Sequence, residues 1–125
     1  MRFNPPKNSD KYEWTRHAIF KLQEYGLSAQ RIVRVIRNPQ RVEKGIVKNT
    51  IAVMQPPSFK AKNGKKIWSQ EIWAMYQIKN QKSEFQKLQI TNQKLKIISA
   101  WRYPGVSPKN NPIPEEIIQE IASLE

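Results

Sequence analysis

The chain has 125 residues, and its 22 lysines and arginines against 10 aspartates and glutamates give a net charge of +12. It contains no cysteine and a single histidine, His17, which excludes disulfides, thiolate metal sites and metal sites built from several histidines. No apolar run approaches the roughly 20 residues that span a bilayer, and the first residues, MRFNPPKNSDK, lack the apolar segment of a signal peptide.

These features predict a cytoplasmic protein without a membrane partner, and the four glycines form no phosphate-binding loop, so no cofactor is predicted. The charge is uneven: residues 1–109 hold 22 basic and 6 acidic residues, whereas residues 110–125 hold four glutamates and no basic residue. A basic body attracts polyanions, nucleic acid first and an anionic membrane or an acidic protein next. The alternative is that the lysines only keep the protein soluble.

A first helix is predicted after a polar lead-in over residues 1–11. It covers RHAIFKLQEYG, with Thr15 or Asp10 as its N-cap and Gly26 as the residue that ends it. One apolar stripe runs along it, formed by Trp14, Ala18, Leu22 and Tyr25.

A second helix, SAQRIVRVIRN, is predicted to begin after Ser28 and to end at Asn38-Pro39. Its apolar positions have helical spacing and are Ala29, Ile32, Val33 and Ile36. Because only about three residues connect the two helices, we expect a tight helical hairpin.

From residue 40 the pattern changes to strands. RVEKG and NTIAVMQ are predicted as two short strands joined near Gly45, and PPSFKAKNGKK as a basic loop in which Asn63-Gly64 indicates a hairpin turn. KIWSQEIWAMYQIK alternates over a long strand. One face of it holds Trp68, Ile72, Ala74, Tyr76 and Ile78, and the other Ser69, Glu71, Trp73, Met75 and Gln77.

The C-terminal third is predicted as a loop or weak strand extension over 80–93, a last strand KLKIISAWR over 94–102, a Pro-rich linker and a short acidic helix. The element order favours an α+β fold: an N-terminal helical hairpin packed on one face of a three- or four-stranded antiparallel sheet, plus the C-terminal helix. We expect one domain over 1–103, with the linker and helix of 104–125 packed on or beside it. The tail isoleucines either cover a sheet face, or the tail glutamates lie across the basic surface and compete with RNA.

Two segments carry a resemblance to a known family. TRHAIFKLQEYGLSAQRIVRVIRNPQRV and KLKIISAWR resemble the opening and the closing strand of BrnT-type bacterial toxins and a related, mostly uncharacterised family, over roughly residues 12–102. The resemblance implies a fold like that of RelE and barnase-like ribonucleases, metal-independent RNA cleavage and a partner antitoxin. The toxins place an arginine directly after Ser-Ala, where this chain has Trp101 and then Arg102. A one-residue slip on a strand turns a side chain to the other face unless a bulge intervenes.

Three residues are candidates for catalysis. RNA cleavage without a metal needs proton donors and acceptors and a cation for the charged phosphorane. His17 suits either proton role because its ordinary pKa is near neutral, Glu71 would be the general base beside it, and Arg102 a bidentate phosphate donor. The alternatives are a boundary histidine bonded to backbone or Glu24, a glutamate paired across the sheet with a lysine such as Lys96, and a solvated strand end.

Other residues are candidates for RNA binding. Lys94 and Lys96 have the same strand parity as Arg102 and would line a phosphate, and Trp73 and Trp101 are predicted to stack on bases. The polar side of the second helix and its exit carries Arg31, Arg34, Arg37 and Arg41, which suits either phosphate contacts or a solvated helix face.

The sequence thus predicts an RNA-interacting protein, with metal-independent RNA cleavage implied by the resemblance. Two alternatives remain open: a non-catalytic RNA- or ribosome-binding module that uses the same surface, and an interaction domain for an acidic, antitoxin-like protein. Interleaved basic and aromatic residues favour single-stranded over duplex RNA.

Overall fold

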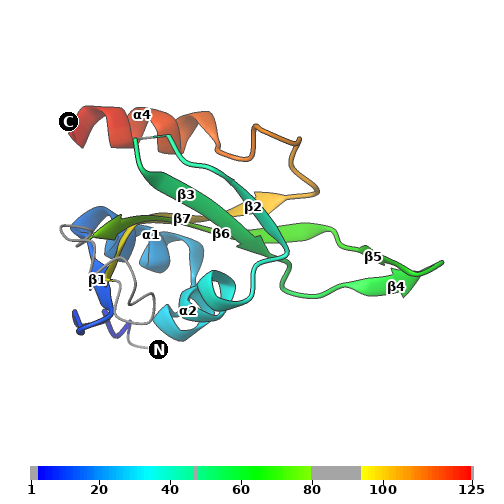
Figure 1. Cartoon of the computed structure of the whole chain (residues 1–125), viewed down its shortest axis with the longest axis horizontal. Helices are drawn as coiled ribbons and strands as arrows, with labels where there is room; N and C mark the ends of the chain where they lie inside the picture. Colours follow the sequence, from blue (N-terminus) through cyan, green and yellow to red (C-terminus); the bar gives the residue numbers. More distant parts are fainter. Residues whose placement is uncertain (1–2, 47, 80–93, 125) are drawn as a thin grey trace, which may run out of the picture.

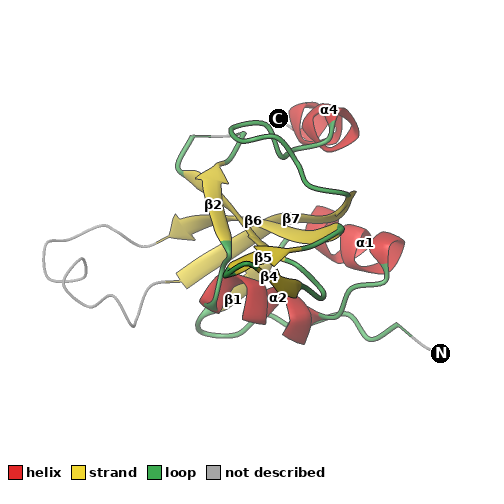
Figure 2. Ribbon diagram, turned by 90° about the vertical axis from the view of Figure 1, so that its right-hand side faces the viewer, coloured by secondary structure: helices red, strands yellow, loops and turns green. Residues whose placement is uncertain are grey.

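The computed structural model describes residues 3–46, 48–79 and 94–124, and it has the predicted α+β architecture (Figure 1). In the described part of the chain a five-stranded sheet has the order β1-β7-β6-β3-β2, and a separate two-stranded sheet is formed by β4 and β5. Helices α1 and α2 lie on one side of the large sheet and α4 lies on the other (Figures 1 and 2). Among the described residues no helix is both long enough and apolar enough to cross a membrane.

The helical hairpin forms where its caps predict it. Helix α1 (Arg16–Tyr25) begins after Thr15, whose hydroxyl accepts a hydrogen bond from the Ala18 backbone N–H, and ends at Gly26 with a φ of 65°. Helix α2 (Ala29–Arg37) begins after Ser28, whose hydroxyl accepts from the backbone N–H of Arg31. The helical hairpin is therefore stabilised by local capping hydrogen bonds, and the residue types that form these caps can be recognised in the sequence.

Strand β1 (Tyr12–Trp14) lies in the segment where the lead-in and the start of the helix were predicted. It pairs in parallel with β7 (Lys94–Pro104), so that Trp14 is opposite Ile97. The assignment of Trp14 to the stripe of the first helix was therefore wrong. A three-residue strand has no measurable alternation of its own, and its partner is more than 80 residues away in the sequence.

The antiparallel part of the sheet has four strands, where three or four were predicted. Strand β6 (Gln70–Lys79) is central and pairs with β7 on one side and with β3 (Thr50–Gln55) on the other, and β2 (Arg41–Lys44) is the edge. Strands β4 (Lys60–Lys62) and β5 (Lys65–Ile67) form the hairpin predicted at Asn63-Gly64. The predicted loop or strand extension over 80–93 lies outside the described residues.

A bulge in β7 changes which side chains share a face. Met75 is opposite Ser99 and Tyr76 is opposite Ile97, so Ile98 has no partner in the register. Sequence parity is therefore lost at this point. Leu95 and Ile97 face α1 and α2, and beyond the bulge Ala100 takes that side while Trp101 packs on the opposite face.

Each face of the sheet is covered by its own apolar cluster. The larger cluster packs α1 and α2 on the sheet and includes Leu22, Ile32 and Val35. The second cluster joins Trp73 and Trp101 to Ile117 and Ile121 of helix α4 (Glu115–Leu124). The reading in which the tail isoleucines cover a sheet face is thus confirmed, and the helices do not all lie on one face.

Candidate nucleic-acid interface

The three predicted catalytic residues lie in three different environments. His17 is half-buried on α1, and its Nε2 lies 3.0 Å from the Ser99 hydroxyl oxygen, so its hydrogen-bond partner is this serine and not Glu24, which acts on the imidazole only through its charge. Burial of the imidazole lowers the pKa of His17, and Glu120 opposes this shift only in part. The imidazole is therefore mainly neutral at pH 7 and is held by a buried serine.

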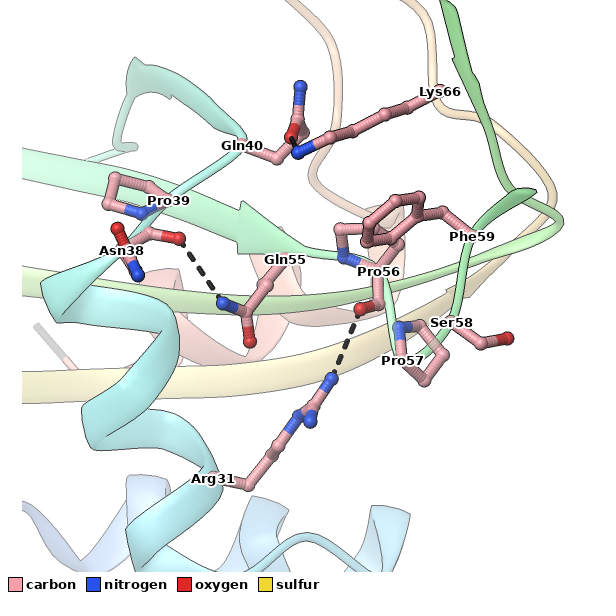
Figure 3. A pocket seen from close by; sticks show the side chains of 10 residues that line it. All are labelled: Arg31, Asn38, Pro39, Gln40, Gln55, Pro56, Pro57, Ser58, Phe59 and Lys66. Atoms are coloured by element: carbon pink, nitrogen blue, oxygen red, sulfur yellow. Dashed lines mark hydrogen bonds between the residues drawn. The ribbon is translucent and has the colours of Figure 1, made fainter. Parts of the chain in front are cut away.

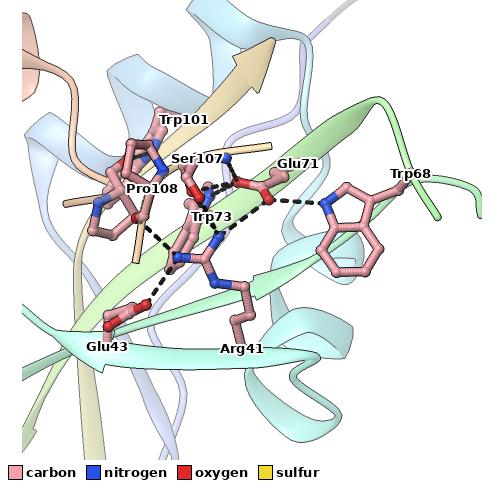
Figure 4. A network of polar contacts seen from close by, with 9 residues as sticks. Arg41, Glu43, Trp68, Glu71, Trp73, Trp101, Ser107 and Pro108 are labelled. Carbon is pink, nitrogen blue, oxygen red and sulfur yellow. Dashed lines mark hydrogen bonds and ion pairs between the residues drawn. The ribbon is translucent and has the colours of Figure 1, made fainter. Parts of the chain in front are cut away.

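Glu71 is fully buried in a polar network on the α4 side of the sheet (Figure 4). One carboxylate oxygen accepts hydrogen bonds from the Ser107 hydroxyl at 2.6 Å and from Trp73 Nε1 at 2.9 Å, and the other accepts from Trp68 Nε1 at 2.8 Å. Burial would raise the pKa of Glu71, but these hydrogen bonds together outweigh burial and lower it. A carboxylate with all its lone pairs engaged is a structural anion, and it is not open to a substrate as a general base.

Arg41 belongs to the same network and not to a row of phosphate-binding arginines. Its guanidinium contacts Glu71 at 3.3 Å, Glu43 at 2.8 Å and the backbone oxygens of Ser107 and Pro108. It also lies 5.1 Å from the centroid of a Trp73 ring. The network therefore ties β2, β6 and the segment before α4 together, and Arg41 is corrected from an RNA-binding to a structural residue.

Trp73 and Trp101 are both fully buried, so neither presents a ring face to a base. Their rings stack on one another, with centroids 6.0 Å apart and an interplanar angle of 7°. Trp68, predicted to share the face of Ile72, packs with this pair instead because β6 begins only at Gln70. The prediction that Trp73 and Trp101 stack on bases is thus contradicted by their burial under α4.

Arg102 does not share a face with Lys96. Its Nε donates to the Tyr25 carbonyl at 2.7 Å and its Nη2 to the Gly26 carbonyl at 3.4 Å, where α1 ends. The bulge at Ile98 leaves Lys94 and Lys96 half-buried on the other side of the sheet, opposite Lys79 and Gln77 in the register. Arg102 thus satisfies carbonyls that the helix leaves free, and the proposed cationic row of Lys94, Lys96 and Arg102 is not formed.

The hairpin of β4 and β5 concentrates the exposed positive charge. It projects away from the body of the protein (Figure 1), and every one of its residues is exposed. The register places Lys60, Lys62 and Lys65 on one face of the hairpin together with Ile67. In the described ranges none of these three lysines has an ion pair or a side-chain hydrogen bond.

The other face of the hairpin borders a surface cavity of about 540 Å³ (Figure 3). Lys66 Nζ lies 4.7 Å from the centroid of the Phe59 ring and 3.3 Å from Gln40 Oε1. Across the cavity, Arg31 Nη2 donates to the Pro56 carbonyl at 3.1 Å. The remaining lining residues are uncharged and are Asn38, Pro39, Gln55, Pro57 and Ser58.

A group of arginines adds positive potential beside this cavity. The pKa of Arg31 is lowered, first by burial and then by the positive charges of Arg34 and Arg102. Arg31 Nε is buried without a hydrogen-bond partner among the described residues. Arg34 and Arg37 are exposed on α2. Like charges gathered without a carboxylate repel one another, and an external anion relieves that repulsion.

The sequence contained the signal for the hairpin but not for the cavity. KAKNGKK places four lysines around a two-residue turn, and this pattern is typical of an exposed basic hairpin. The prediction for this segment is a basic loop with a hairpin turn at Asn63-Gly64, and its lysines and Phe59 are not among the predicted site residues. The cavity joins residues near positions 31, 40, 56 and 66, which only the packing of α2 beside β3 brings together.

Among the described residues no group of three or more His, Cys, Asp and Glu side chains is arranged to hold a metal ion. Neither His17, Glu71 nor Arg102 lines any of the described cavities. No protein-family model, no curated protein and no solved structure matches this chain. The resemblance to BrnT-type toxins therefore rests on the two sequence signatures alone.

Proposed function

We propose that the protein binds RNA, and that the basic hairpin of β4 and β5 is its main contact with the phosphate backbone. The observation that carries the proposal is the gathering of Lys60, Lys62 and Lys65 on one exposed face without an acidic partner in the described part of the chain. Three like charges at this spacing repel each other, and a phosphate backbone neutralises them together with release of counterions.

The arginines of α2 extend the same surface. Arg34 and Arg37 are exposed, and Arg31 borders the cavity next to the hairpin. Lys66 lies on the opposite face of the hairpin from Lys60, Lys62 and Lys65 and lines the same space as Arg31. A chain of phosphates that passes around the hairpin can therefore reach α2 beside the cavity. Of the residues predicted to contact RNA, Arg31, Arg34 and Arg37 remain in this proposal.

Binding without catalysis is favoured over a ribonuclease. His17, Glu71 and Arg102 each have a structural partner, and their contacts place them at Ser99, at the network of Ser107, and at the end of α1. A catalytic site needs an acid, a base and a cation around one phosphate. A relationship of this fold to BrnT-type toxins remains a proposal. The alternative partner is an acidic, antitoxin-like protein.

The test is binding of a labelled single-stranded RNA in EDTA at 50 and 200 mM salt, measured by fluorescence anisotropy, with cleavage followed on gels. The variant K60Q/K62Q/K65Q is compared with K7Q/K44Q/K48Q, which removes the same charge from exposed lysines elsewhere. We expect the hairpin variant to lose about 10-fold or more in affinity at low salt. Its salt slope should fall by about 2, because each single-strand phosphate contact contributes roughly 0.7.

The control variant should lose less than about 3-fold, since it changes only the overall field. Equal losses in the two variants would place the binding elsewhere and reduce the hairpin to one part of a general positive charge. Cleavage in EDTA that disappears in His17→Ala would restore the ribonuclease hypothesis.

A further inference from the structure

Beside the phosphate-binding hairpin, the cavity shown in Figure 3 has a chemistry of its own. Its lining combines one aromatic ring, two cations and three amide side chains, and it contains no carboxylate. We propose that it receives one unpaired base of a single-stranded RNA, with Phe59 as the stacking surface. This inference rests on the proposed function and adds to it the form of RNA that is recognised.

The volume of the cavity and the exposure of the Phe59 side chain both fit a base. The cavity volume of about 540 Å³ lies within the range of roughly 300–1,000 Å³ that is usual for small-ligand sites. The Phe59 side chain is 52% exposed although it lies against Lys66, so half of its surface is free for contact. Unlike Phe20, which is also exposed beside a lysine, Phe59 lines a cavity, so its free ring face is placed where a base could stack on it.

The amides supply the groups that read a base edge. Asn38, Gln40 and Gln55 each carry an acceptor oxygen and an NH₂ donor, as the edges of bases require. Gln55 uses its NH₂ to hold the backbone oxygen of Asn38 at 3.2 Å, and Gln40 accepts from Lys66 at 3.3 Å. Each of these contacts uses one polar group of a glutamine and holds the side chain in place. The second polar group of each glutamine is then held ready for a ligand.

The cations fit the phosphate that accompanies the base. Lys66 lies on one side of the cavity and Arg31 on the other. The unsatisfied Nε of Arg31 is a buried donor, a type of group that is rare in folded proteins unless a ligand or water completes it. In a duplex the bases are paired and stacked and cannot enter such a space, and for this reason the geometry selects single strands.

The experiment compares two RNA strands of the same length and charge, one with a base at every position and one with abasic sites over its central positions. Binding of each is measured with the wild type, with Phe59→Leu and with the matched control Phe20→Leu. Phe20 is 58% exposed on α1, has Lys21 Nζ 5.8 Å from its ring centroid and lines none of the described cavities, so the control makes the same substitution away from the hairpin. Circular dichroism confirms that each variant is folded.

We expect the wild type and Phe20→Leu to prefer the complete strand by about 10-fold, as one stacked base allows. Phe59→Leu should reduce that preference to less than about 2-fold while the salt slope stays unchanged, because the phosphate contacts remain. Equal binding of the two strands by the wild type would overturn the base site and leave the proposed RNA binding standing. Absence of binding to either strand would overturn both.

A second measurement locates the base. A strand with 4-thiouridine is crosslinked by near-ultraviolet light and the modified peptide is identified by mass spectrometry. Crosslinks within residues 55–66 support the proposal. Crosslinks confined to Lys94–Arg102 or to α4 contradict it and move the base to another face of the sheet.

Discussion

At the residue scale, the candidate catalytic side chains show how much a role depends on neighbours. Glu71 has the residue type of a general base, yet four donors from Trp68, Trp73 and Ser107 bind its carboxylate in a buried network. Removing one member of such a network leaves buried groups unpaired, which typically costs about 3 kcal/mol. The carboxylate therefore stabilises the segment that leads to α4. It could act as a general base only by giving up the hydrogen bonds that hold this segment.

His17 allows a clean test at the same scale because it is the only histidine in the chain. Burial lowers its folded-state pKa below the ordinary value of 6.5, so the folded protein favours the neutral imidazole. Between the two pKa values the unfolded chain binds a proton that the folded chain does not. The contribution of His17 to stability is thus present above pH 6.5 and is lost as the pH falls through the folded pKa.

We therefore expect an NMR titration of the His17 ring protons to have its midpoint below 6.5. The free energy of unfolding in urea should be lower at pH 5.5 than at pH 7.5. In His17→Gln, which keeps a polar group near Ser99, this part of the pH dependence should be absent. A midpoint at or above 6.5 would mean that the carboxylates of Glu120 and Glu24 dominate the environment instead of burial.

At the element scale, the β4–β5 hairpin differs from every other strand pair. Its residues belong to neither apolar cluster, and its charges are all positive. A hairpin that buries nothing adds little to the stability of the body it projects from. We interpret its regular strand pairing as a means to hold the lysines at a fixed spacing.

This leads to an exchange experiment. Replacing residues 59–67 with a short Gly-Ser turn should change the free energy of unfolding by less than about 1 kcal/mol, because only exposed residues are removed. Trp68 is kept, since its Nε1 donates to Glu71. RNA affinity should fall at least as far as in K60Q/K62Q/K65Q. A large loss of stability would show that the hairpin supports the fold, and a retained affinity would place RNA binding on α2 alone.

At the scale of the whole molecule, α4 makes the protein one structure in three layers. It covers the two stacked tryptophans with Ile117 and Ile121, and α1 reaches it through Lys21, which is fully buried. Lys21 Nζ lies 2.6 Å from Glu120, 3.1 Å from Glu24 and 3.9 Å from Glu116. Two of the tail glutamates therefore have a structural cation as partner, which argues against a tail that competes with RNA.

The corresponding prediction concerns Ile117, which is fully buried. Ile117→Ala should lower the free energy of unfolding by about 3 kcal/mol, the usual cost of deleting a large aliphatic side chain from a core. Tryptophan fluorescence during urea unfolding measures it, because Trp73 and Trp101 lie beneath the helix. Glu115→Gln, at an exposed position of the same helix, serves as control and should change stability by less than about 0.5 kcal/mol.

If Ile117→Ala proves neutral, α4 does not pack on the sheet in solution, and the acidic tail would be free to act elsewhere. Because of the same packing, deleting residues 110–125 would not show whether the tail glutamates compete with RNA. It would uncover Trp73 and Trp101 and destabilise the protein before affinity could be compared.

Features that depend on residues close together in the chain could be predicted from the amino acids alone. The caps Thr15 and Ser28, the stop at Gly26 and the Asn63-Gly64 turn act through hydrogen bonds and backbone angles within a few residues, so the helical hairpin, four strands and the α+β class could be predicted. Net charge, which needs no fold, pointed to a polyanion partner. Of the candidate interface, only Arg31, Arg34 and Arg37 were predicted as RNA contacts.

Features that depend on contacts between distant segments of the chain became visible only in the folded structure. The parallel pairing of β1 with β7 adds a strand that local alternation cannot reveal. The bulge at Ile98 separates Lys96 from Arg102, since one unpaired residue exchanges the two faces for everything beyond it. The packing of α4 buries Trp73 and Trp101, and the packing of α2 beside β3 builds the cavity around Phe59. Burial depends on how the whole chain packs. Residue type alone therefore predicted Trp73 and Trp101 to be exposed, although both are buried.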